Sequence, residues 1–136
     1  MNVLDIPFVK KVGIELNSDN NLELALEESI LNHVKSIHAS AQFTLAEAAS
    51  GKLLQKHFPD LVGKVVPLLR ESQVKFKKPA LKSIVAKASI SEEEIQKFTM
   101  QFERKGRASI TVGVEVSDSD GTITCVASFN WFVQTI

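Results

Sequence analysis

Residues 38–56 read HASAQFTLAEAASGKLLQK. The stretch is rich in alanine, and two serines and a glycine add to its small residues. Alanine is the strongest helix former, so we expect a helix here despite Gly51. The stretch is only weakly amphipathic, which indicates burial on several sides and not a surface position. Its small side chains would let a neighbouring sheet approach closely. We therefore predict a thin helix that the rest of the chain encloses.

The segments after this helix have the period of β-strands. Apolar residues from Ala108 to Val116 alternate with small or polar ones, residues 118–121 form a turn, and residues 122–133 return as a second strand. Residues 65–76 are strand-like until Pro79 ends the run, and residues 83–90 are rich in β-branched side chains. Most of the second half of the chain is therefore predicted to be strand.

Three further elements complete the prediction. Residues 6–12 have helical spacing with Pro7 near the first turn, and residues 14–16 and 22–26 alternate on either side of a polar turn. The pattern Ser91-Glu-Glu-Glu94 is a capping box that opens a charged helix ending near Gly106. The sum is an α+β fold in a single domain, residues 1–136. It has about five antiparallel strands, one buried helix and two peripheral helices.

Composition excludes several classes of protein. Of 136 residues, 44% are hydrophobic and 24% are charged, and 16 basic residues balance 16 acidic ones. Zero net charge argues against a nucleic-acid partner. No apolar run is long enough to span a membrane, and the single cysteine, Cys125, fits a reducing cytoplasm. The histidines and Cys125 lack metal-ligand spacing, so we expect no metal and Cys125 as a small core or interface residue.

One ordered set of residues carries a resemblance. Asn32 precedes His38 by six residues, small residues open the helix, and Glu47 follows His38 by nine. This order resembles the hotdog-fold acyl-CoA thioesterases, most closely the phenylacetyl-CoA and 4-hydroxybenzoyl-CoA thioesterase type and a branch of short stand-alone domains. The segment Phe76-Lys-Lys-Pro-Ala80 and the hairpin of residues 114–121 are similar to that family's, and together these marks span nearly the whole chain.

The resemblance implies a fold and an activity. In the hotdog fold an antiparallel sheet wraps around a central helix, here about residues 39–56, and two sheets join edge to edge in a homodimer or a dimer of dimers. The implied reaction is hydrolysis of an acyl-CoA or acyl-carrier-protein thioester. No cofactor is implied, since coenzyme A enters only as part of the substrate.

The resemblance also implies roles for individual residues. The N–H of Ala39, with Ser40 as a second candidate, would polarise the thioester carbonyl, and Glu47 would act as general base or nucleophile. Asn32 would position water or substrate, and His38 would contact the substrate or orient the helix start. The residues expected to bind the substrate are Ser40, Lys77, Lys78, Pro79 and Ala80.

Geometry adds a requirement of its own. At about 1.5 Å per residue, Glu47 lies roughly 12 Å along the helix from Ala39. The carboxylate and the N–H of one chain therefore cannot serve one carbonyl. Two antiparallel helices related by a twofold axis could bring Glu47 of one chain to Ala39 of the other, which predicts a dimer with two equivalent sites.

Several alternatives stay open. Many family members have Gly-Gly where this chain has Ala39-Ser40, which leaves a catalytically silent thioester-binding module as the rival function; a hotdog dehydratase fits less well. Asn32 could be a turn residue only.

The lysines around Pro79 (Lys75, Lys77, Lys78 and Lys82) could protect a strand edge instead of binding phosphate, and Arg104, Lys105 and Arg107 form a second basic patch. Phe129, Trp131 and Phe132 could belong to the core, a dimer interface or an acyl pocket.

Overall fold

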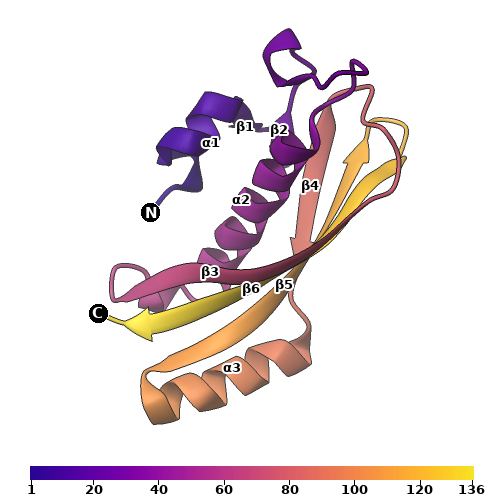
Figure 1. Ribbon diagram of the computed structural model, residues 1–136. Coiled ribbons are helices and arrows are strands. Elements are labelled where there is room, and N and C mark those ends of the chain that lie inside the picture. Colours follow the sequence, from indigo (N-terminus) through magenta and orange to yellow (C-terminus); the bar gives the residue numbers. More distant parts are fainter.

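The computed structural model describes all 136 residues as a curved antiparallel sheet wrapped around one long helix (Figure 1). The strands are β1 (Ile14–Leu16), β2 (Leu22–Leu24), β3 (Val65–Phe76), β4 (Ile84–Ser89), β5 (Arg107–Asp118) and β6 (Ile123–Thr135). The helices are α1 (Pro7–Val12), α2 (Ala39–His57) and α3 (Glu92–Lys105), with 3-10 turns η1 (Val3–Asp5), η2 (Glu28–Ile30) and η3 (Pro59–Leu61). The sheet order is β1-β2-β4-β5-β6-β3, and every pairing is antiparallel. The predicted α+β class is confirmed, with six strands instead of five.

The core lies between α2 and the concave face of the sheet. On β5 and β6 every second residue is buried, and Phe129 packs edge-on against Phe43 of α2 with ring centroids 5.4 Å apart. Trp131 is buried on the same face, and Cys125 is a fully buried core residue, as predicted. Phe132 points to the opposite face, where the Arg70 guanidinium lies 5.0 Å from its ring centroid. The aromatic residues of β6 therefore divide between the two faces of the sheet.

The helix α3 stands where β4 would otherwise continue. β4 pairs with β5 only from Gly113 to Asp118, which leaves the first half of β5 beside α3 (Figure 1). The predicted Ser91 cap is present, since its hydroxyl accepts a bond from the Glu94 N–H at 3.1 Å. The Glu94 carboxylate does not return to the helix start: it accepts a 3.0 Å bond from the Thr111 N–H of β5. One glutamate thus ties the helix to a strand edge that β4 leaves unpaired.

The other side of the sheet ends in a long exposed strand. β3 pairs only with β6, and its register shifts between Leu69 and Glu71. Its apolar side chains Val66, Leu68 and Phe76 are 43%, 57% and 46% exposed. A twelve-residue edge of this kind leaves a row of backbone N–H and C=O groups free to pair with another chain.

Candidate active site

The amino-terminal end of α2 presents one free N–H group. His38 caps the helix: its Nδ1 accepts a bond from the Ser40 N–H at 3.0 Å. Its carbonyl accepts bonds from the N–H groups of Ala41 and Gln42, at 3.0 and 3.1 Å. Only Ala39 among these first four residues keeps an N–H without a partner. The Ala39 N–H is therefore free to donate a hydrogen bond at the end of a nineteen-residue helix that carries a partial positive charge. The Ser40 N–H already donates to His38.

The Asn32 side chain builds the loop in front of this helix. Its Oδ1 accepts bonds from the N–H groups of Val34 and Ser36, both at 3.0 Å, and its Nδ2 donates to Ser36 Oγ at 2.8 Å. Lys35, at the tip of the same loop, has a left-handed φ of 63°. These bonds match the turn role that the sequence left open for Asn32 and leave one amide hydrogen for any other role.

The segment after β3 lies against this loop. The Ile37 N–H donates to the Ala80 carbonyl at 2.9 Å, immediately before the His38 cap. The N–H groups of Lys77 and Lys78 both donate to the Thr124 carbonyl, at 2.8 and 3.4 Å. The fold thus brings the residues 77–80, expected to bind substrate, to the start of α2. The side chains of Lys77 and Lys78 are exposed there and form no ion pair.

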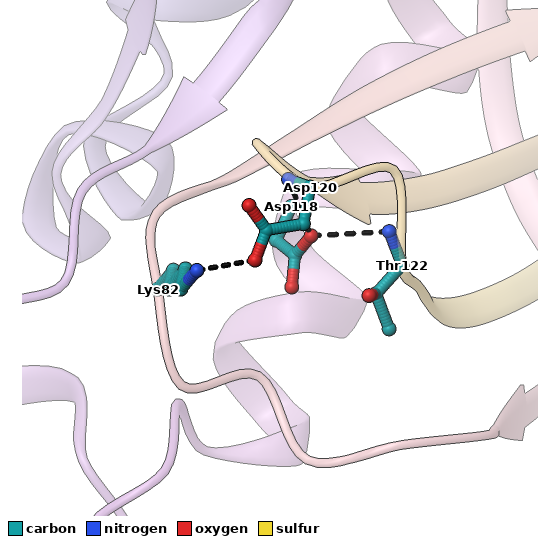
Figure 2. A network of polar contacts seen from close by, with 4 residues as sticks. All are labelled: Lys82, Asp118, Asp120 and Thr122. Atoms are coloured by element: carbon teal, nitrogen blue, oxygen red, sulfur yellow. Dashed lines mark hydrogen bonds and ion pairs between the residues drawn. The ribbon is translucent and has the colours of Figure 1, made fainter.

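Lys82 differs from the other lysines of this cluster. Figure 2 shows its ammonium directed at the carboxylate of Asp120, with which it forms a hydrogen-bonded ion pair. Asp120 is held in place by Asp118, whose Oδ1 accepts bonds from the N–H groups of Asp120 at 2.9 Å and Thr122 at 3.1 Å. Lys82 therefore secures the turn between β5 and β6, and Lys75, Lys77 and Lys78 remain available to an anion.

Glu47 lies on α2 where the helix faces β6. The residues one turn before and after it, Phe43 and Gly51, lie against Phe129 and Trp131 of that strand. The Glu47 carboxylate is half-buried and has neither a hydrogen bond nor an ion pair. Burial raises the pKa of Glu47. As the helix rise requires, Glu47 and Ala39 of one chain stay far apart.

Sequence reasoning did not find an apolar cavity at the other end of α2. The cavity holds about 240 Å³ and is lined by parts of α2, η3, β3, α3 and β6. The large apolar residues that line it, such as Phe58 at the end of α2 and Phe98 on α3, lie far apart in the sequence. The second basic patch, residues 104–107, lies at the carboxyl-terminal end of α3, where Gly106 meets Thr135.

The structure gathers no group of three or more His, Cys, Asp or Glu side chains that could hold a metal ion. None of its helices has the length and apolar character that crossing a membrane requires.

The sequence matches a known protein family, and the fold matches solved structures. Residues 5–133 match the family model described as a domain of unknown function, DUF4442. The chain belongs to the DUF4442 family. No curated protein sequence matches this DUF4442 chain.

Solved structures share the fold of this DUF4442 chain. A Pseudomonas aeruginosa protein of unknown function, described as a probable thioesterase, is 22% identical with a TM-score of 0.82, over 98% of this chain and 91% of its own. The Haemophilus influenzae thioesterase HI1161 is 12% identical with a TM-score of 0.77, over 98% and 86%. A Bacillus halodurans protein crystallised with CoA is 19% identical with a TM-score of 0.70, over 97% and 85%. The predicted hotdog fold is confirmed, whereas the phenylacetyl-CoA type stays a prediction.

Proposed function

We propose that this DUF4442 chain hydrolyses an acyl thioester, of CoA or of an acyl-carrier protein, at a site shared by two protomers. The observation that carries the proposal is that α2 holds two groups without a partner. They are the free N–H of Ala39 at the start of the helix and the half-buried carboxylate of Glu47 further along it. Two proteins of the same fold support the proposal. The Haemophilus influenzae protein is described as a thioesterase, and the Bacillus halodurans protein was crystallised with CoA.

The two groups have complementary roles in the reaction. The Ala39 N–H donates to the thioester oxygen, and this bond strengthens as negative charge develops there. Glu47 accepts a proton from a water molecule whose oxygen attacks the carbonyl carbon. The tetrahedral intermediate then expels the thiolate, which takes up a proton, and leaves the free acid. In the alternative course Glu47 attacks directly, and water hydrolyses the resulting mixed anhydride. A raised pKa suits the first course, because a stronger base removes the proton more readily.

The site requires a second copy of the chain. The eight residues between Ala39 and Glu47 correspond to about 12 Å of helix, too far for both groups to contact one carbonyl. The exposed edge of β3 offers the surface for pairing, since its backbone is unpaired and Val66, Leu68 and Phe76 are uncovered. In a twofold dimer with antiparallel α2 helices, each Glu47 serves the other protomer's Ala39, and two equal sites result.

The lysines beside the helix start supply a place for the phosphates of CoA. Lys77 and Lys78 are exposed on the segment that Ala80 fixes against Ile37, next to the free N–H of Ala39. Pro79 and Ala80 shape the wall of this region, and the exposed Ser40 hydroxyl lies on the first turn of α2. A thioester bound at the Ala39 N–H would thus keep its phosphates in a positively charged environment.

The sharpest test removes one N–H without removing a side chain contact. Ala39 is the first residue of α2, a position that favours proline, and His38 has φ −60° and ψ 140°, which suit a residue before proline. Ala39→Pro is therefore expected to fold and to lose about 10²–10³-fold in kcat, the cost of one oxyanion donor. Ala39→Gly, which keeps the N–H, is the matched control and should retain activity. Equal activity of the two variants would exclude the Ala39 N–H from the reaction.

Mixed dimers test the shared site. We expect Glu47→Gln and Ala39→Pro to be inactive alone. A dimer with one copy of each carries both defects in one site and neither in the other, so unfolding and refolding an equal mixture should restore about a quarter of wild-type activity. If each site lay within one chain, mixing would restore nothing.

The rival function is a thioester-binding module without turnover. It is favoured by one feature of the sequence, the Ala39-Ser40 pair, which stands where many of the hotdog thioesterases that this chain resembles have Gly-Gly. Calorimetry with acyl-CoA alongside the thiol-release assay distinguishes the two functions, because the rival predicts binding by wild type and by Glu47→Gln with no thiol released by either.

A further inference from the structure

We propose that β3 pairs antiparallel with β3 of a second copy of the chain in one register, in which Arg70 lies opposite the partner's Glu71. The inference rests on the proposed function, which needs a second copy to complete each site, and it specifies how that copy binds. β3 is a free edge of the sheet, since it pairs with β6 alone (Figure 1). Arg70 and Glu71 lie side by side at its centre, and neither forms an ion pair within its own chain.

The backbone of β3 presents its free groups in two series. The Lys64 carbonyl and the Lys77 N–H, just outside the two ends of β3, form hydrogen bonds on the β6 side at 3.1 and 2.8 Å. Backbone groups of successive strand residues point to alternate sides. Counted inward from the two ends, the residues directed away from β6 are therefore Val65, Pro67 and Leu69, and then Ser72, Val74 and Phe76. Arg70, the extra residue where the register with β6 shifts, and Glu71 separate the two series.

Only one register brings free groups opposite free groups along the whole strand. A twofold axis between Arg70 and Glu71 makes the first series of one chain meet the second series of the other. The resulting pairs are Val65 with Phe76, Pro67 with Val74 and Leu69 with Ser72. A shift by one residue sets free groups against groups that already bond to β6. A shift by two residues sets Leu69 or Ser72 against the two central residues, which belong to neither series.

The charges at the axis agree with this register. The Arg70 guanidinium stacks on Phe132, 5.0 Å from the ring centroid, and so lies on the convex face of the sheet. Glu71 lies opposite Asn130, which shares that face because it is two residues from Phe132. Each Arg70 therefore faces the partner's Glu71, and two pairs of opposite charge form at the centre of the interface. An axis through either residue would instead set like charges opposite each other.

Cysteine cross-linking tests the register directly. In this register Leu68 lies opposite the partner's Gln73, and both side chains are exposed. Their backbone groups point to β6, so they form a non-hydrogen-bonded pair with α-carbons about 4.5 Å apart, which a disulfide can bridge. Mild oxidation of Leu68→Cys/Gln73→Cys is expected to give a covalent dimer. The native Cys125 is buried and does not compete.

The matched control is Leu68→Cys/Lys75→Cys, whose cysteines face each other only in a register shifted by two residues. In the proposed register these cysteines are diagonal neighbours about 7–8 Å apart, so the control should form the covalent dimer about tenfold more slowly. Equal rates, or faster linking of the control, would overturn the register.

A charge exchange tests the pairs at the axis. Glu71→Arg keeps the stacking of Arg70 on Phe132 but sets like charges opposite each other, and should raise the dimer Kd about tenfold in analytical ultracentrifugation. Arg70→Glu should have a similar effect. The double variant Arg70→Glu/Glu71→Arg restores opposite charges and should bring the Kd back towards that of wild type. A double variant that dimerises no better than the single ones would remove the Arg70–Glu71 pair from the interface.

Thiol release from acyl-CoA, measured separately, distinguishes this proposal from the proposed function. If the cross-linking confirms the register and wild type cleaves no acyl-CoA, the interface stands and the proposed function fails. An active dimer that links only through the control pair overturns the register and leaves hydrolysis standing. A chain that stays monomeric at every concentration overturns both, because each site then lacks its second half.

Discussion

The indole Nε1 of Trp131 donates a 2.9 Å hydrogen bond to the hydroxyl of Ser50, and both residues are buried. Ser50 in turn donates to the main-chain carbonyl of Glu47 at 2.7 Å. The bond joins β6 to α2 within one turn of the proposed catalytic carboxylate. A single serine thus links Trp131 of β6 to the turn of α2 that carries Glu47.

We expect Ser50→Ala to lower the free energy of unfolding by about 1–3 kcal/mol, because the buried indole N–H loses its only partner. Urea unfolding followed by tryptophan fluorescence measures the change, since Trp131 is the only tryptophan. Trp131→Phe alone and combined with Ser50→Ala completes a double-mutant cycle. Strictly additive effects would mean that the Trp131–Ser50 bond contributes no stability.

Glu47→Gln should stabilise the protein in a pH-dependent way. Burial raises the folded-state pKa of Glu47 above its ordinary value of 4.5, so between the two values the folded state holds more protons than the unfolded state. The free energy of unfolding of wild type therefore falls as pH rises through this range, and the uncharged glutamine escapes that loss.

Denaturant titrations of both proteins from pH 4 to pH 8 measure this difference. The advantage of Glu47→Gln should be smallest at the acid end and constant once pH exceeds the raised pKa. An advantage that is largest at low pH would show that Glu47 is stabilised in its ionised form by a partner, which is the opposite sign.

The bond from Glu94 to β5 makes a third prediction. Glu94→Ala should lower the free energy of unfolding by about 1–3 kcal/mol, because the Thr111 N–H loses a charged acceptor. Glu93→Ala is the matched control, since it removes an equal charge from the same helix turn and Glu93 is exposed without such a bond. Comparable losses in the two variants would assign the effect to the helix dipole instead.

The elements that the sequence predicted are those with local signals. The small residues of 38–56, the alternation of 108–133 and the Ser91 cap each depend on neighbours a few positions away, and each is confirmed. That the sheet wraps around the central helix was predicted only from the family resemblance, because no local sequence pattern indicates it.

The missed features depend on contacts between distant segments. The capping-box pattern indicated that Glu94 would return to Ser91, yet its carboxylate binds Thr111, since β4 ends early and leaves that N–H unpaired. The cavity combines five elements, so no stretch of sequence carries its signature. The roles of Ala39, Glu47 and Asn32 remain predictions, because they concern a substrate and a second chain.

Gly51 is the last position with a measurable consequence. It lies inside α2 with ordinary helical backbone, and a Cβ there would meet Trp131 at 3.6 Å, a normal van der Waals contact. Gly51→Ala should therefore raise the free energy of unfolding by about 0.5–1 kcal/mol, the difference in helix propensity. Urea unfolding of both proteins at neutral pH measures the difference. A destabilised Gly51→Ala would mean that α2 and β6 need the closest approach at Trp131 that only glycine permits.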